Sequence, residues 1–158
     1  MTTTREPTRD ADELYQTLVL AHARAPRNQG ALPAATHSAR GDNPFCGDRF
    51  TVSLILKDDT VADARFEGSG CAVATAAASM MTAALKGLTR AQVEALAGRF
   101  EALLAGGVEP GANADPALGE LRAFAGVRRF PVRVKCARLP WQTMSAALAG
   151  TSAPVSTE

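Results

Sequence analysis

The clearest pattern of hydrophobic and polar positions lies in the middle of the chain, at residues 49–57. Its apolar side chains fall on alternate positions: Phe50, Val52, Leu54 and Leu56. Such alternation places one set of side chains on a single face of a β-strand. Residues 58–60 form a polar turn, and residues 61–67 alternate again, with Ala62, Ala64 and Phe66 as the apolar set. The pattern predicts an antiparallel hairpin.

Residues on both sides of the hairpin have helical spacing. Apolar residues recur at helical intervals from Asp10 onward, which predicts a helix that ends near Pro26. Residues 31–42 have the composition of a loop. Beyond the hairpin, residues 71–86 are mostly small and apolar, and they predict a helix that can approach a sheet closely.

The second half of the chain predicts three more helices. Thr89 and Gln92 have the spacing of a capping box, which opens a helix that ends near residue 105. We expect a shorter helix at residues 116–124 and a last one at residues 140–150. Between these two, valines alternate with basic residues at 130–136, which predicts a short extended stretch.

Composition and charge narrow the class of protein. The 158 residues, 46% hydrophobic and 21% charged, are typical of one globular domain, which we place at residues 10–150 between disordered ends at 1–9 and 151–158. The formal net charge of +1 gives no electrostatic reason to expect nucleic acid or a membrane surface as a partner. No signal peptide and no membrane-spanning run is evident, so we expect a cytoplasmic protein.

The candidate chemistry is concentrated in three cysteines and one aspartate: Cys46, Asp48, Cys71 and Cys136. An odd number of cysteines argues against a disulfide framework. If the strand's parity runs back from Phe50, Cys46 and Asp48 share its buried face, and a buried carboxylate needs a partner that a metal would supply. Three thiolates and one carboxylate form a complete ligand set for zinc, and sulfur ligands also suit an iron–sulfur cluster.

Simpler interpretations stay open at this point. The thiols can be inert core residues, since free cysteine is among the most buried residue types, and Asp48 can be a turn residue before the strand. The spacing lacks the paired CxxC motifs of ordinary structural zinc modules, so the whole fold would have to assemble the site. Arg133 lies near the third cysteine, where it would offset negative charge or serve simply as a solvated surface residue.

Several motifs together resemble the SufU proteins of bacterial iron–sulfur cluster assembly, within the wider IscU-like (NifU N-terminal) scaffold fold. These motifs are residues 26–30, 43–48, 70–71 and 130–137, and the likeness runs from about residue 12 to 148. Two features favour the SufU branch. Lys135 stands where IscU proteins carry a histidine, and an extra segment at about residues 102–126 separates the last two cysteines.

The resemblance implies an α+β fold with a small antiparallel sheet packed by helices, and a zinc ion held by residues 46, 48, 71 and 136. It implies an enzyme, a zinc-dependent sulfurtransferase partnered with a SufS-type cysteine desulfurase and with downstream iron–sulfur assembly proteins. A histidine of the desulfurase would displace Cys46 from the zinc, and the freed thiolate would take the terminal sulfur of the enzyme's persulfide, with Arg133 as a helper. The alternative is an IscU-type scaffold that assembles a transient iron–sulfur cluster and passes it on.

Overall fold

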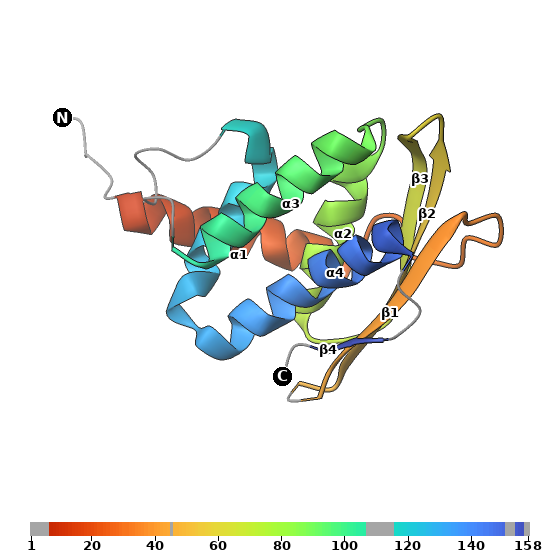
Figure 1. Cartoon of the computed structure of the whole chain (residues 1–158). Coiled ribbons are helices and arrows are strands. Elements are labelled where there is room, and N and C mark those ends of the chain that lie inside the picture. Colours follow the sequence, from red (N-terminus) through yellow and green to blue (C-terminus); the bar gives the residue numbers. More distant parts are fainter. Residues whose placement is uncertain (1–6, 45, 107–115, 151–153, 157–158) are drawn as a thin grey trace.

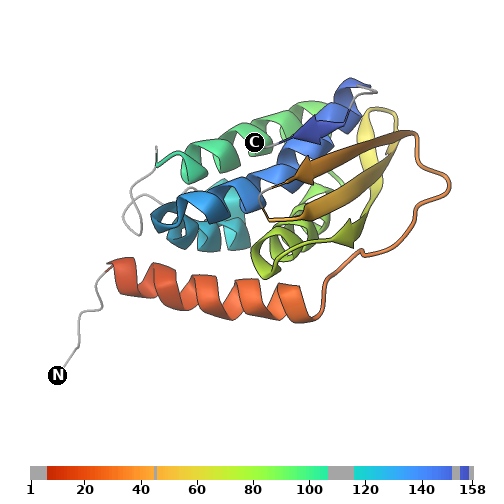
Figure 2. The same cartoon turned by 90° about the horizontal axis from the view of Figure 1, so that it is seen from below.

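The chain folds into a four-stranded sheet with helices packed against one of its faces (Figures 1 and 2). The computed structural model describes residues 7–44, 46–106, 116–150 and 154–156. The helices are α1 (Pro7–Arg24), α2 (Ala72–Leu85), α3 (Arg90–Leu104), the 3₁₀ segment η1 (Pro116–Arg129) and α4 (Pro131–Ala149). The strands are β1 (His37–Asn43), β2 (Asp48–Lys57), β3 (Thr60–Ser69) and β4 (Val155–Ser156).

The strands follow the order β3-β2-β1-β4, and the arrangement confirms the predicted α+β class. β1, β2 and β3 pair in antiparallel fashion, whereas β4 adds to β1 in parallel. The sheet is therefore mixed and not purely antiparallel. β4 also contradicts the expectation of disorder at residues 155–156, and α1 begins at Pro7, so residues 7–9 are helical where disorder was predicted.

The predicted hairpin is present as β2 and β3. Asp58 and Asp59 both have positive φ angles, of 51° and 63°, which suits the tight turns that connect antiparallel strands. The register shifts between Ile55 and Leu56, at a β-bulge. Because an extra residue reverses the faces beyond it, Val61 is buried and Ala62 is exposed, so the prediction for Ala62 was wrong.

β1 corrects the prediction of a loop at residues 31–42. Its inward positions hold small residues, Ala39 and Gly41, so the strand lacks the large apolar residues by which strands are recognised. α4 explains the small residues, because it packs closely on this strand. A Cβ at Gly41 would lie 3.0 Å from Leu139 Cδ1 and would overlap Thr143. The small side chains made this strand hard to recognise from the sequence, and they also allow α4 to approach it.

α4 corrects the prediction of an extended stretch at residues 130–136. Pro131 occupies the first turn of the helix, where its missing N–H costs nothing, and the backbone N–H groups of Arg133 and Val134 both donate to the Phe130 carbonyl. The helix thus starts nine residues before Pro140, which lies inside it. Cys136 is therefore a helical residue and not part of a junction between a strand and a helix.

The helices form two layers on the sheet (Figure 2). α2 and α4 pack directly on it, and α1, α3 and η1 cover them from outside. The outer layer is held in part by Phe100 of α3, which stacks on Trp141 of α4 and meets Phe124 of η1 edge to face. η1 runs to Arg129, through a kink at Gly119, and does not end at residue 124 as expected. Residues 107–115 of the extra segment lie outside the described residues.

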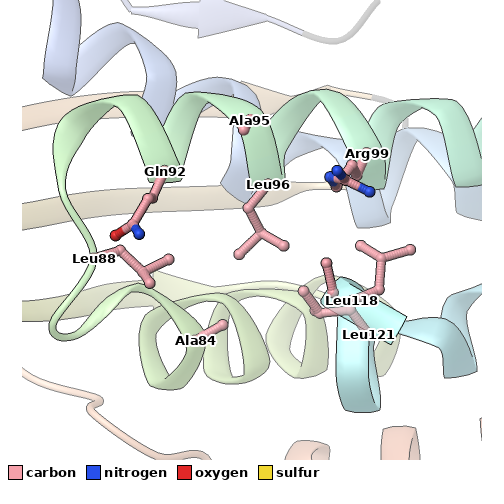
Figure 3. Close-up of a pocket in the computed structure, with 9 residues that line it drawn as sticks. Ala84, Leu88, Gln92, Ala95, Leu96, Arg99, Leu118 and Leu121 are labelled. Atoms are coloured by element: carbon pink, nitrogen blue, oxygen red, sulfur yellow. The ribbon is translucent and has the colours of Figure 1, made fainter. Parts of the chain in front are cut away.

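A hollow of about 300 Å³ lies between α2, α3 and η1 (Figure 3). Leu88, Leu96 and Leu118 contribute apolar walls, and Gln92 and Arg99 project from α3 at its margin. Its lining includes none of the four candidate ligands. The candidate chemistry therefore lies elsewhere. Among the described helices, none combines the length and hydrophobicity needed to cross a bilayer.

Candidate metal centre

Three of the four predicted ligands come together in the structure. One ligand atom from each of Cys46, Asp48 and Cys136 lies within 4.8 Å of the other two. Asp48 is 1% exposed and Cys136 is fully buried, whereas Cys46 is half-buried. The residues are distant in sequence, so the fold has assembled the cluster. That they bind a metal remains a prediction.

Regular secondary structure positions two of the three residues. Asp48 is the first residue of β2 and pairs across the sheet with Asn43, the last residue of β1. Cys136 lies in the second turn of α4, the helix that packs on β1. Cys46 instead belongs to the short connection between β1 and β2, where its backbone N–H donates to the Asn43 carbonyl at 3.3 Å. Two candidate ligands are thus fixed by regular elements, and the third is on a turn.

Cys71 lies beside this group but is not a member of it. It caps the N-terminus of α2, where its sulfur accepts from the backbone N–H of Ala74 at 3.5 Å. Its own backbone N–H donates to Asp48 Oδ1 at 2.8 Å. A hydrogen bond with the Cys136 thiol, assisted by the backbone at the helix start, lowers the pKa of Cys71 to about 6. The same bond, together with burial, raises the pKa of Cys136.

The distances within the group test whether zinc fits. The sulfur atoms of Cys136 and Cys46 are 3.2 Å apart. Two sulfurs on a tetrahedral zinc, each about 2.3 Å from it, are separated by about 3.8 Å, so a small outward movement gives the required spacing. Soft sulfur with one hard oxygen is a donor set that zinc accepts. The residues present therefore fit zinc, with Cys71 as the neighbour able to complete four-coordination.

Arg133 is one helical turn before Cys136 and on the same face of α4. The charge of the Cys71 thiolate, together with hydrogen bonds to Cys136 and Cys71, raises the pKa of Arg133. The other arginines near the ligands in sequence have partners elsewhere. Arg49 pairs with Asp42 at 3.0 Å, and Arg138 pairs with Glu101 at 2.8 Å. Arg133 is thus a cation that faces the thiols.

Comparison with known proteins identifies the family. Residues 14–137 match the NifU-like N terminal domain. This chain belongs to the NifU-like N-terminal domain family. The resemblance noted from the sequence motifs is therefore confirmed at the level of the family.

Similar proteins are named for iron–sulfur cluster assembly. The NifU-like chain is 38% identical over 138 residues to the zinc-dependent sulfurtransferase SufU of Bacillus subtilis (strain 168), which covers 87% of this chain and 91% of the relative. It is 34% identical over 137 residues to the iron–sulfur cluster assembly scaffold protein IscU of Streptococcus pyogenes serotype M1, with 87% and 84% covered. The fold is also similar to a crystal structure from Fervidobacterium islandicum AW-1, of a putative iron–sulfur cluster assembly scaffold protein for the SUF system. The two structures superimpose with a TM-score of 0.77 at 28% sequence identity. The match covers 86% of this chain and 97% of the other.

Sequence reasoning overlooked one residue of the NifU-like domain's site. Asn43 is fully buried, and its side-chain Nδ2 lies 3.4 Å from Asp48 Oδ2 and 3.7 Å from Cys136 Sγ. Asn43 belongs to the motif at residues 43–48, but neutral amides are not usual ligands for zinc, so the motif alone assigns it no role. Its only local signal is its place directly before the turn that carries Cys46.

Proposed function

We propose that this NifU-like protein is a zinc-dependent sulfurtransferase of iron–sulfur cluster assembly that receives sulfur on Cys46 from a SufS-type cysteine desulfurase. The observation that carries the proposal is the meeting of Cys46, Asp48 and Cys136 within 4.8 Å. Similarity along most of the chain to a relative named as a zinc-dependent sulfurtransferase supports it. Free thiols of this kind suit a reducing compartment, which agrees with a place in the cytoplasm.

Zinc would be held by Cys46, Asp48 and Cys136, with Cys71 as the fourth ligand. The ion, when bound, supplies a double positive charge that keeps thiols ionised and has no redox chemistry of its own. Other groups of the chain hold the ligands in position. Asp48 is oriented by the N–H of Cys71, and Cys136 is held within α4.

Cys46 is the best placed acceptor of sulfur. It is more exposed than Cys136, and it lies on a turn, whereas the sulfur of Cys71 is held by the backbone N–H of Ala74 at the start of α2. Its thiolate attacks the terminal sulfur of the donor's cysteine persulfide, and a new sulfur–sulfur bond forms at Cys46 as the donor's bond breaks. The donor cysteine leaves as a thiolate that takes up the proton released from the persulfide. No external oxidant or reductant is needed, because one disulfide-type bond replaces another.

Arg133 would assist the transfer. Its guanidinium faces Cys71 and Cys136, and in this position it offsets the negative charge that three thiolates and a carboxylate bring together. It projects from the beginning of α4 and is exposed, so a docked donor can reach it. We therefore assign Arg133 a role in stabilising the thiolates during exchange.

The proposed function is tested by metal analysis combined with a desulfurase assay. Purified protein should contain about one zinc per chain, and its addition should accelerate a cognate cysteine desulfurase. Mass spectrometry should then find one added sulfur atom on Cys46. Cys46→Ala should lose both the acceleration and the persulfide. A desulfurase whose turnover is unchanged by the zinc-loaded wild-type protein would overturn the proposal.

A second candidate function is that of a scaffold for cluster assembly, which the names of the IscU relatives and of the similar solved structure favour. The same thiols would then hold iron and sulfide. Anaerobic incubation with ferrous iron, sulfide and the desulfurase separates the two. A scaffold gains the visible absorption of a cluster and transfers it to an apo-protein, whereas the sulfurtransferase keeps its zinc.

A further inference from the structure

Asn43 contacts all three members of the ligand group, but it does so in two different ways. Its side-chain Nδ2 faces Asp48 and Cys136, at 3.4 and 3.7 Å. Its backbone carbonyl accepts from the N–H of Cys46 and does not hold the Cys46 sulfur. Asn43 therefore contacts the side chains of two candidate ligands, whereas the Cys46 sulfur contacts Cys136 Sγ instead, at 3.2 Å.

The orientation of the Asn43 amide follows from charge. Asp48 is a carboxylate that is 1% exposed, so a neighbouring donor lowers the cost of burying it, whereas a neighbouring carbonyl oxygen would raise that cost. The two hydrogens of Nδ2 point to two different acceptors, a carboxylate and a sulfur. The amide can thus donate to Asp48 of the sheet and to Cys136 of α4 at the same time.

The other end of the amide shows that this arrangement is not optimised for stability. Asn43 Oδ1 is buried and has no hydrogen-bond partner among the residues that the structure describes. A buried carbonyl without a partner costs free energy, and an apolar side chain of similar size would avoid that cost. Asparagine at this position therefore costs stability at Oδ1, and the two contacts of Nδ2 are what offset that cost.

We propose that Asn43 is a positioning residue that orients Asp48 and Cys136, but not the sulfur of Cys46, for zinc. The inference rests on the proposed zinc site, but it does not rest on sulfur transfer. Donors in the outer sphere of metal ligands orient them and are worth about 10- to 100-fold in metal affinity. The Asn43 amide would act in this way for a carboxylate and a thiolate together.

The test uses the full-length protein with Asn43→Leu, Asn43→Ala and, as the matched control, Thr143→Val. Leucine keeps the bulk of the side chain and removes both amide groups. Thr143 is buried in the same β1–α4 interface and donates to the Leu139 carbonyl, and it has no bond to a candidate ligand. Zinc affinity is measured by competition with a chromophoric chelator, and cobalt(II) replaces zinc to report thiolate coordination by its absorption bands. Thermal unfolding is followed in the metal-free protein.

We expect both Asn43 variants to bind zinc about 10- to 100-fold more weakly and to shift or weaken the cobalt bands. The metal-free Asn43→Leu protein should unfold within a few degrees of the wild type, and Thr143→Val should keep wild-type zinc affinity whatever its unfolding temperature. Wild-type zinc affinity and an unchanged cobalt spectrum in Asn43→Leu would overturn the inference. So would a wild-type protein that binds neither ion.

The desulfurase assay separates this inference from the proposed function. If wild-type protein fails to stimulate the desulfurase while Asn43→Leu still weakens zinc binding, the proposed transfer fails and the role of Asn43 stands. If wild-type protein stimulates the enzyme and Asn43→Leu binds zinc normally, the role of Asn43 fails and the transfer stands.

Discussion

The backbone N–H of Cys71 donates to the Asp48 carboxylate at 2.8 Å, which joins the start of α2 to the start of β2. Gly70 makes this contact possible. A Cβ at Gly70 would lie 2.8 Å from Asp48 Oδ1 and equally close to the ring of Phe50. The backbone before α2 can approach the carboxylate only because Gly70 has no side chain.

Gly70→Ala is therefore expected to displace Asp48 and to weaken zinc binding by at least about tenfold, the lower end of what disturbed ligand orientation costs. Gly98→Ala is the control, because Gly98 is exposed in α3 and a Cβ there meets nothing within 4 Å. That change should stabilise the protein by about 0.5–1 kcal/mol. Chelator competition and thermal unfolding measure both effects. Tight zinc binding by Gly70→Ala would contradict the contact.

Arg133→Ala should retain zinc but slow the transfer of sulfur to Cys46, because the charge that faces the thiols is removed while the four candidate ligands remain. Arg138→Ala is matched to it, since Arg138 lies on the same helix but pairs with Glu101. The rate of persulfide formation on Cys46, followed by mass spectrometry, distinguishes the two variants. Equal rates of persulfide formation in the two variants would show that Arg133 has no role in the transfer.

The thiols of the metal-free protein should differ in reactivity. The pKa of Cys71 is lowered to about 6 and that of Cys136 is raised, so at pH 7 Cys71 is mainly thiolate and Cys136 mainly thiol. Iodoacetamide should modify Cys71 before Cys136, with a rate that rises with pH and is half-maximal near pH 6. Peptide mapping after short exposures gives the order, and faster labelling of the buried Cys136 would refute it.

His22 should make stability depend on pH. It is buried, bonded to Ser79 Oγ at 2.7 Å and 3.6 Å from the Glu120 carboxylate. Burial and the charge of Arg27 lower its pKa below 6.5, although Glu120 opposes them. Between the folded and unfolded pKa values of His22, the unfolded chain therefore binds more protons than the folded one. The contribution of His22 to the free energy of unfolding is complete above about pH 6.5 and declines as the pH falls below that value.

His22→Gln removes this titration. In urea unfolding of the metal-free protein, the free energy of unfolding of the wild type should exceed that of the variant most above pH 7. The difference should shrink toward pH 5, because only the wild type has a buried imidazole to protonate. A difference that grows as the pH falls would show the opposite sign of shift.

The local sequence pattern was sufficient to predict the hairpin and the starts of α2 and α3. Alternation defined β2, and the Thr89–Gln92 capping box is present at the start of α3. These features depend on neighbours in the sequence, so they can be read from it. Strand parity placed Asp48 on the buried face correctly, but it does not extend to Cys46, which lies on the turn before β2.

The structural features that the sequence did not predict depend on contacts between distant segments. β1 and the middle of α4 pack closely together, because Gly41 lets Leu139 and Thr143 approach the strand. Valines and a proline at residues 130–136 indicated an extended stretch, yet Pro131 occupies the first turn of α4 and the segment is helical. The contacts of Asn43 with Asp48 and Cys136 exist only once these two elements have met.

Pro140 has no N–H, and the acceptor that an N–H at this place in α4 would use is the carbonyl of Cys136. The helix runs unbroken from Pro131 to Ala149, but it lacks one backbone hydrogen bond at the residue that carries a candidate ligand. Its first two turns, with Arg133 and Cys136, are connected to the remainder by one hydrogen bond fewer than a helix without an internal proline would have. Beyond Pro140 the buried side chains of Trp141 and Met144 anchor α4 in the core, so the segment before Pro140 is the part of the helix with the fewest restraints from its own backbone.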